Sequence, residues 1–461
     1  MSAAPASTVL RGRRAAPFQA PRLASIAGPM FAEMALGLLS GLVGTALAAR
    51  QGDAMGAAFG LANQVAAMLF VLFRIVGAGI GVVIAQALGG GHRGAAERSA
   101  RAAIGASTWV GGGCALLALA AAWPLMRLMH APADVLPQAA GFLQWLAPTV
   151  LLDAWLTALA TVLRSHLKVR STLKVMLLMQ LLHLGLAWPM MTAWGWGLAG
   201  YAWALLLARG VGIALLLWLW RQELGVAVQR ADWWRLQLAT LRPMLAVGLP
   251  GAAENIAWRL AYMTSIAVVG SLGTVALATH AYVMQVVHLL LPFSMAIGLS
   301  AEIVVGHLVG AGQLHSANRL VRRSLARGLG LAAVVALCAA LAGPWLMRRF
   351  TADPRIIVLG SQVLWLVVAV ETGRCFNLVL VNTLRAAGDA RYPVTAGAVS
   401  FAAVLAGGSW LLGVGLGAGL AGVFAAYAAD EWLRGLLMWR RWVSLGWVPF
   451  ARRAHRRLQR H

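Results

Sequence analysis

Two stretches, Pro29-Met-Phe-Ala-Glu33 and Pro250-Gly-Ala-Ala-Glu254, share the pattern Pro-x-x-x-Glu and stand 221 residues apart. The chain has 461 residues but only 16 Pro and 14 acidic residues, so their joint recurrence indicates an internal duplication. The same shift aligns Gly77 with Gly298, Gly89 with Gly310, Arg98 with Arg319, Leu163-Arg164 with Leu384-Arg385 and, after one inserted residue, Gly197-Leu-Ala-Gly200 with Gly419-Leu-Ala-Gly422. The sequence therefore predicts two copies of one structural unit.

Each copy consists of apolar segments long enough to cross a lipid bilayer. The chain is 61% hydrophobic and 11% charged, with a mean hydropathy of +0.76. Segments of about 20 apolar residues span the hydrocarbon layer as helices. We place twelve of them at 23–49, 55–88, 102–122, 138–163, 173–194, 197–220, 243–269, 275–309, 328–346, 356–384, 393–413 and 417–439. This pattern predicts an all-α integral membrane protein and excludes a water-soluble enzyme.

The positive charge is concentrated in alternate loops. The net charge is +24, and 29 of the 38 Lys and Arg residues lie in the two tails and in one set of alternate gaps, while the opposite set holds five. Cytoplasmic loops of membrane proteins are enriched in Lys and Arg. We therefore expect both termini in the cytoplasm, and we attribute the charge to topology and to contact with anionic lipids rather than to nucleic-acid binding.

Six spans per copy give both copies the same orientation in the membrane. We predict a basic N-terminal tail (1–22), an N-lobe (23–220), a cytoplasmic connector (221–242), a C-lobe (243–440) and a basic C-terminal tail (441–461). Two parallel six-helix lobes are related by a pseudo-two-fold axis along the membrane normal. Transporters built in this way place substrate and ion sites near the midplane, where the lobes face each other.

Charged residues inside spans are costly and therefore indicate functional sites. Glu33 and Glu254 have no basic residue three or four positions away, so we expect them to be unpaired carboxylates that exchange a coupling ion in a shared central cavity. Glu371 and Arg374 are three residues apart and are predicted to form an ion pair, with Glu371 a further candidate for ion coupling. The remaining embedded charges are Arg74, Asp153, Arg209, Arg259 and Glu302.

An aromatic residue accompanies one of these acids. Trp258 lies one helical turn after Glu254, so both side chains occupy one face of the predicted helix. An indole ring and a carboxylate together attract an organic cation. Glu254 and Trp258 are therefore predicted to bind substrate. Cys114, Cys338 and Cys375 lack the spacing of a metal or disulfide framework, and we expect no resident metal or cofactor.

Several stretches resemble the multidrug and toxic compound extrusion (MATE) transporters, from about residue 23 to 441. They are Gly248-Leu-Pro250, Gly270-Ser-Leu-Gly-Thr274, Val305-Gly-His-Leu-Val-Gly-Ala-Gly312 and Leu384-Arg-Ala-Ala-Gly-Asp389. Glu371-Thr-Gly-Arg374-Cys-Phe-Asn377 and Asp430-Glu-Trp432-Leu-Arg434-Gly435 resemble a bacterial branch of that family. The resemblance implies a monomeric, two-lobed antiporter in the bacterial plasma membrane that exports organic, often cationic, compounds in exchange for H⁺ or Na⁺.

The resemblance also implies which helices face the cavity, and these carry the further candidate substrate residues Tyr262, Asn63 and Gln285. Sodium, as the coupling ion, would bind at Glu254. One departure is clear: many members have Asp in a Val-Asp-Thr stretch of the first span, where this chain has Val43-Gly44-Thr45. A coupling scheme that depends on that Asp cannot be transferred to this chain.

Two alternatives remain open at this stage. A lipid-linked precursor flippase of related architecture would need Arg74, Arg209, Arg259 and Arg374 to converge on one cavity. A non-transporting membrane scaffold would need no embedded acids. The chain has no phosphate-binding G-x-x-x-x-G-K sequence and no nucleophile-base pattern, which disfavours an ATP-driven pump and a membrane enzyme.

Overall fold

The computed structural model describes residues 18–459, without the side chains of residues 71, 72, 74–76 and 78. Arg74, one of the predicted embedded charges, therefore lies outside the described side chains, as does most of the predicted N-terminal tail. The described chain is helical, and the predicted twelve spans correspond to long helical segments. Within the described residues, nine helices are long and apolar enough to cross a membrane by composition. Others, such as α15, are long but carry buried charges.

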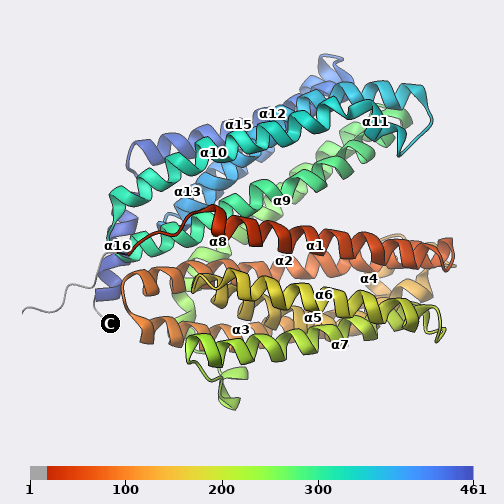
Figure 1. Ribbon diagram of the computed structural model, residues 1–461. Helices are drawn as coiled ribbons and strands as arrows, with labels where there is room; N and C mark the ends of the chain where they lie inside the picture. The colour runs from red at the N-terminus through yellow and green to blue at the C-terminus, as the bar shows by residue number, and fades with distance from the viewer. Residues whose placement is uncertain (1–17, 460–461) are drawn as a thin grey trace, which may run out of the picture.

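The helices gather in two groups that diverge from a common end (Figure 1). The first group contains α1 (Ala24–Ala49), α2 (Asp53–Gly89), α3 (Arg93–Ala120), α4 (Ala122–Leu128), α5 (Leu136–Ser165), α6 (Val169–Met191) and α7 (Gly197–Leu219). The second contains α8 (Leu238–Ser271), α9 (Thr274–Gly310), α10 (Leu314–Leu341), α11 (Gly343–Arg348), α12 (Pro354–Ala386), the consecutive α13, η3, α14 and η4 (Arg391–Gly415) and α15 (Gly419–Val443). Between and after them lie η1 (Trp220–Leu224), η2 (Arg230–Trp233) and α16 (Val448–Gln459).

The duplication extends to the backbone of the turns. Gly52 and Gly273 precede α2 and α9 with φ angles of +127° and +98°. Gly91 and Gly312 follow the same two helices with φ angles of +80° and +73°. These left-handed conformations favour glycine because it has no Cβ atom. The two copies therefore begin and end their second helix with the same turn geometry.

The lobes meet at the end of the bundle that carries the basic loops, which we call the basic side. There α2 and α9 cross so closely that a Cβ atom on Gly89 would overlap the carbonyl oxygen of His307. One on Gly310 would overlap the carbonyl oxygen of Gln86. The 221-residue shift relates Gly89 to Gly310 and Gln86 to His307, so the contact is reciprocal, as a two-fold axis requires.

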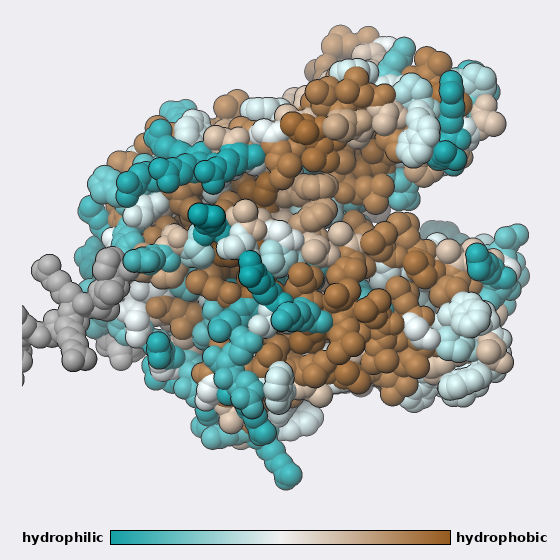
Figure 2. Space-filling model, viewed as in Figure 1, coloured by the Kyte–Doolittle hydropathy of each residue, from teal (hydrophilic) through white to brown (hydrophobic). Residues whose placement is uncertain are grey.

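The opposite end, which we call the far side, is open. Figure 2 shows a groove between the lobes there, and an apolar surface over the middle of both lobes. Large apolar side chains such as Leu116 (67% exposed) and Val399 (70% exposed) lie on this outer surface. So much exposed apolar area is unfavourable in water but is stable in contact with lipid. The crossing of α2 and α9 closes the molecule at the basic side, and the groove leaves it open at the far side.

Candidate functional site

Both repeated acids are paired with arginine. Glu254 Oε2 lies 2.6 Å from Arg385 Nη2, and Glu33 pairs with Arg164 in the same way. Both ion pairs are largely buried, with 12% and 14% of the Glu254 and Arg385 side chains exposed. The expectation that Glu33 and Glu254 lack a basic partner is therefore wrong.

The error came from considering only neighbours on the same helix. Each acid reaches an arginine 131 positions later in the chain, from α1 to α5 and from α8 to α12. The signal was present in the sequence, because the duplication preserves Leu163-Arg164 as Leu384-Arg385 together with Glu33 and Glu254. Two embedded charges of opposite sign, each kept in both copies, predict a pair, since an unpaired charge in a span is costly.

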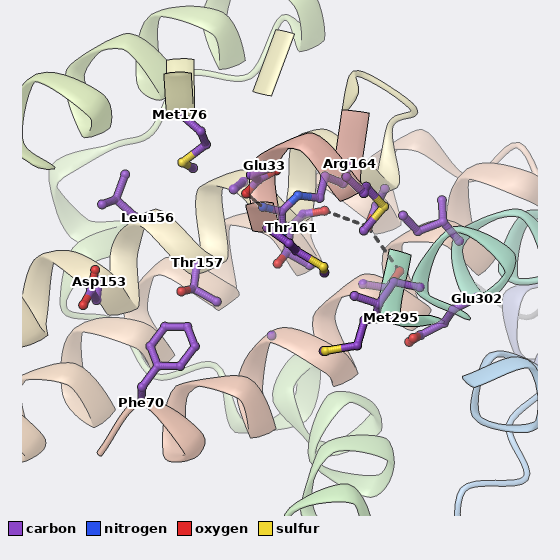
Figure 3. A pocket seen from close by; sticks show the side chains of 18 of the residues that line it. Glu33, Phe70, Asp153, Leu156, Thr157, Thr161, Arg164, Met176, Met295 and Glu302 are labelled. Atoms are coloured by element: carbon purple, nitrogen blue, oxygen red, sulfur yellow. Dashed lines mark hydrogen bonds and ion pairs between the residues drawn. The ribbon is translucent and has the colours of Figure 1, made fainter. Parts of the chain in front are cut away.

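Glu33 lines a cavity of about 420 Å³ between α1, α2, α5, α6 and α9. In Figure 3, Glu33 and Arg164 point toward one another, and Asp153 and Glu302 lie on either side of them. The remaining wall is mostly apolar and flexible, with Met30, Met34, Met176, Met179 and Met295. Methionine side chains adapt to ligands of different shapes. The cavity thus combines three carboxylates with an adaptable apolar wall.

Two of the acids at this cavity, Glu33 and Asp153, are held by arginines of the N-lobe. Asp153 Oδ2 lies 2.7 Å from Arg209 Nη2, and Arg209 also donates to the carbonyl of Thr149 at 3.1 Å. Glu254 is not among the residues that line this cavity. It packs against Gly397 of α13 instead. The two repeated acids therefore do not share this cavity, contrary to expectation.

The lining also bears on the flippase alternative. That function would need Arg74, Arg209, Arg259 and Arg374 in one cavity, and none of the last three lines the one described here. Arg209 is held by Asp153, and Arg374 lies in the C-lobe with Glu371. Among the described side chains, the arginine that lines this cavity is Arg164, already paired with Glu33. The described residues of this cavity therefore do not bring together the free guanidinium groups that a pyrophosphate would need.

A network of buried charges connects α12 and α15 in the C-lobe. The predicted pair is present, with Arg374 Nη1 2.5 Å from Glu371 Oε1. Arg374 also contacts Glu431 at 3.3 Å, and Arg434 contacts both Glu431 and Asp430, at 2.8 and 2.7 Å. Three carboxylates thus share two guanidinium groups, which leaves an excess of one negative charge in the fully ionised network.

Two oxygen atoms in this network have no donor within the described chain. They are Glu371 Oε2 and Asn377 Oδ1, both buried. Asn377 Nδ2 donates to Glu431 Oε2 at 3.0 Å, which fixes the amide. Buried polar atoms are normally hydrogen-bonded, so an acceptor without a donor is a candidate position for a proton or a cation. Sequence reasoning found Glu371 but missed Asp430, Glu431 and Arg434 as site residues. Glu431 reaches Arg374 on α12, but Arg434 pairs with Asp430 and Glu431 on α15 itself, at spacings of four and three residues that the sequence shows.

Two aromatic residues of α8, both predicted substrate residues, contact each other. The rings of Trp258 and Tyr262 stack at 5.2 Å with an interplanar angle of 8°. Trp258 is 36% exposed, so one side of the stack is accessible. Deeper in the lobe, the Tyr427 hydroxyl is a hydrogen-bond partner of His280 Nε2 at 3.2 Å and of Ser265 Oγ at 2.9 Å. Glu254, Trp258 and Tyr262 therefore follow one another along a single helix.

The remaining predicted substrate residues are Asn63 on α2 and Gln285 on α9. Asn63 donates to the carbonyl of Phe59 in its own helix at 3.0 Å, so its amide is engaged locally. Gln285 is exposed on α9, and the 221-residue shift relates it to Gln64, which is exposed on α2. Neither Asn63 nor Gln285 lines the cavity beside Glu33.

Gly44, at the position where the resembling family often has Asp, faces a tyrosine. A Cβ atom on Gly44 would lie 2.7 Å from Tyr201 Oη and 3.0 Å from the Phe59 ring. Tyr201 packs edge-on against His183 at 4.7 Å. An aromatic cluster therefore occupies the space next to Gly44, and no carboxylate could be accommodated there without displacing it.

Comparisons with known proteins agree with this architecture. The MatE family model matches residues 29–188 and 250–411. The two matches begin at Pro29 and Pro250, the first residues of the duplicated pattern. Together they cover more than half of the chain, once in each lobe.

Relatives and solved structures extend over nearly the full length. The uncharacterized transporter YisQ of Bacillus subtilis is 29% identical over 92% of this chain and 94% of its own. The probable multidrug resistance protein NorM of Chromobacterium violaceum is 27% identical over 87% of this chain and 85% of its own. The crystal structure of the Vibrio cholerae MATE transporter VcmN in the bent form has the same fold, with a TM-score of 0.80 at 22% identity over 94% and 98% of the two chains. The chain belongs to the MatE family and is a multi-pass membrane transporter, not an enzyme.

Proposed function

We propose that this protein exports organic cations from the cytoplasm in exchange for H⁺ or Na⁺ by alternating access. The basic side is the cytoplasmic side, because it carries most of the Lys and Arg residues. The arrangement described above is then outward-open, with the cytoplasmic ends of α2 and α9 closed at Gly89 and Gly310.

The observation that carries the substrate class is the cavity beside Glu33. Its wall combines the carboxylates of Glu33, Asp153 and Glu302 with five methionine side chains and Phe70. Carboxylates attract a cation through Coulomb forces, which strengthen in a space of low dielectric constant. Thioethers and an aromatic ring adapt to apolar groups of varied shape. An amphipathic organic cation matches both properties. When no cation is bound, the guanidinium of Arg164 occupies the part of the site beside Glu33.

A second binding surface lies on α8, at Trp258 and Tyr262. The stacked rings present a face to which a cation binds with about 0.5 to 2 kcal/mol. Glu254 lies one turn away and is neutralised by Arg385 at 2.6 Å. A cation that competes with Arg385 for this carboxylate would link substrate or ion binding to movement of α12 against α8. Gln285, exposed on α9, would contribute a polar contact in the cleft.

We place the coupling ion at Glu371 and Asn377. The acceptors Glu371 Oε2 and Asn377 Oδ1 are buried without donors, and the surrounding network has one more carboxylate than guanidinium groups. A proton on Glu371 would remove the excess charge and supply a donor. A sodium ion would instead be coordinated by the two oxygen atoms, the ligand type that hard cations prefer. Coupling follows when the ion binds one lobe arrangement more tightly than the other.

Dye efflux from proteoliposomes, driven by an ion gradient, tests this proposal. A fluorescent cationic dye is loaded, and its efflux is driven by a pH gradient or a sodium gradient in separate samples. We expect Glu371→Gln to remove the response to both gradients while the protein remains folded in the membrane. Asp353→Asn is the matched control, because Asp353 is an acid outside the membrane-spanning helices that pairs with Arg355 at 3.1 Å. Unchanged gradient dependence in Glu371→Gln, or the same loss in Asp353→Asn, contradicts the assignment.

A further inference from the structure

The last described helix, α16, lies across the ends of the bundle at the basic side (Figure 1). It follows α15 and contacts both α9 of the C-lobe and α2 of the N-lobe. Its outward surface carries the exposed residues Arg452, Arg453, Arg456 and Arg457. A helix with one basic face and one packed face is typical of a protein surface, with the apolar side on the core and the charged side outward.

The first turns of α16 are attached to the C-lobe. The Trp447 indole, 1% exposed, stacks on Trp442 of α15 at 4.3 Å with an interplanar angle of 7°. Ala451 is fully buried in the same apolar core. The Phe450 carbonyl approaches Gly388, in the turn between α12 and α13. These contacts make the start of α16 a fixed part of the C-lobe.

The last turn of α16 reaches the place where the lobes meet. His455 Nδ1 donates to the carbonyl oxygen of Gly310 at 2.8 Å. Gly310 is the residue whose backbone crosses Gln86 of α2. Leu458 packs on the N-lobe core, and its Cδ1 lies 3.4 Å from the position of a Cβ atom on Gly90. His455 and Leu458 thus join the C-terminal end of α9 to the C-terminal end of α2.

We propose that His455 and Leu458 are positioning residues of the transport cycle, and that α16 is a latch that holds the lobes together on the basic side. This proposal rests on the alternating-access function proposed above. An inward-open state requires the ends of α2 and α9 to separate. Because the first turns of α16 are buried in the C-lobe, the contact that must break is the one between Leu458 and the N-lobe. The latch therefore favours the state closed at the basic side.

The corresponding segment of the other repeat packs differently within the described chain, although the sequence continues there in the same register. Residues 226–237 correspond to residues 448–459 by a shift of 222, the offset after the inserted residue. That segment packs on its own lobe, where Trp233 contacts Trp155 at 4.7 Å and the Trp234 carbonyl accepts from Trp109 at 2.9 Å. The same place in the two repeats thus serves two roles, because α16 contacts both α9 and α2, whereas the corresponding segment of the other repeat packs on α3 and α5.

Distance measurements between the lobes test the latch without transport. Spin labels are attached at Arg93→Cys and His315→Cys, two exposed positions on the basic side, in a Cys338→Ser background that removes the exposed native thiol. We expect Leu458→Ala to raise the population with a long inter-label distance by about threefold or more, given the apolar area lost. Val448→Ala is the matched control, because Val448 packs against a different apolar core from Leu458, the one that holds Trp442 and Trp447. Equal distributions in Leu458→Ala and Val448→Ala overturn the proposal.

A reversible cross-link supplies the second test. In Gly90→Cys/Leu458→Cys, oxidation forms a disulfide between α16 and the end of α2. We expect gradient-driven dye efflux to stop after oxidation and to recover on reduction. Leu458→Cys alone under the same oxidant is the control. Full transport with the cross-link intact would show that the latch need not open and would overturn the proposal. Because the distance experiment needs no substrate, a wrong substrate or coupling ion would leave its result unaffected.

Discussion

Glu254 of α8 and Arg385 of α12 form an ion pair of 2.6 Å, and the duplicated copy repeats it between Glu33 of α1 and Arg164 of α5. Each pair joins the first helix of a lobe to its fourth long helix, so it both neutralises an acid in the membrane and fixes two helices against each other. A guanidinium is the group that any transported cation must displace to reach either carboxylate.

The Glu254–Arg385 pair gives a stability prediction. Arg385→Gln alone leaves Glu254 as a buried charge without its partner and is expected to cost about 3 kcal/mol, because breaking one side of a buried pair is more costly than removing both. Glu254→Gln/Arg385→Gln should recover most of that loss. Thermal unfolding of the detergent-solubilised protein checks the order of the variants. A double variant no more stable than Arg385→Gln would contradict the prediction.

Asn377 gives a prediction that separates the two coupling ions. Asn377→Leu removes an amide oxygen that sodium would need as a ligand but leaves the Glu371 carboxylate for a proton. Dye efflux driven by a sodium gradient should fall by about tenfold or more, and dye efflux driven by a pH gradient should persist. Asn255→Leu is a suitable control, because its amide bonds only its own helix at 2.8 Å and is exposed. Equal loss under both gradients would assign Asn377 a structural role instead.

The close crossing of α2 and α9 predicts that a larger residue at position 89 separates the lobes at the basic side. Gly89→Val places side-chain atoms where the backbone of His307 lies, so the two helices cannot approach as closely. The distance between the lobes at the basic side should increase in the label experiment described above. Gly112→Val is the control, because a Cβ atom on Gly112 would meet nothing within 4 Å. An unchanged distance in Gly89→Val is the result that this account does not allow.

Gly44 predicts the outcome of introducing the acid found in many relatives. Gly44→Asp places a carboxylate against Tyr201 and Phe59 and should lower the melting temperature by several degrees, through overpacking and through burial of a charge. Gly44→Asp/Tyr201→Ala makes room and should regain part of the loss. If Gly44→Asp has the same melting temperature as the native protein, the aromatic cluster is more adaptable than its packing indicates.

His166, between α5 and α6 and outside the spans, predicts a pH effect. Burial is the main cause that lowers the pKa of His166, the positive charge of Lys168 lowers it further, and a hydrogen bond to the Val162 carbonyl opposes both. The unfolded chain then binds more protons near its ordinary pKa of 6.5. The contribution of His166 to the stability of the folded protein is fully present above pH 6.5. It is lost as the pH falls toward the lower pKa that His166 has in the folded protein. His166→Gln should therefore flatten the dependence of melting temperature on pH below 6.5, the ordinary pKa of this group.

Much of the fold followed from local chemistry. The apolar runs determined that the chain crosses the membrane as helices, and the recurrence of Pro-x-x-x-Glu determined two copies in one orientation. The Glu371–Arg374 pair and the placement of Glu254 and Trp258 on one helix face also followed, because residues three or four positions apart on a helix lie on the same face. The positions of these residues within one element needed no knowledge of the neighbouring helices.

The tertiary structure decided which charges meet. Arg385 reaches Glu254, Arg164 reaches Glu33, and Glu431 joins Arg374, each from a helix distant in the chain. It also decided that the basic side is closed and that α16 lies across both lobes. Helical periodicity fixes the face on which a side chain lies but not the helix that faces it. The sequence alone therefore identified Glu33, Glu254 and Glu371 as embedded acids, and only the packing of the helices determined that Arg164 and Arg385 pair with the first two.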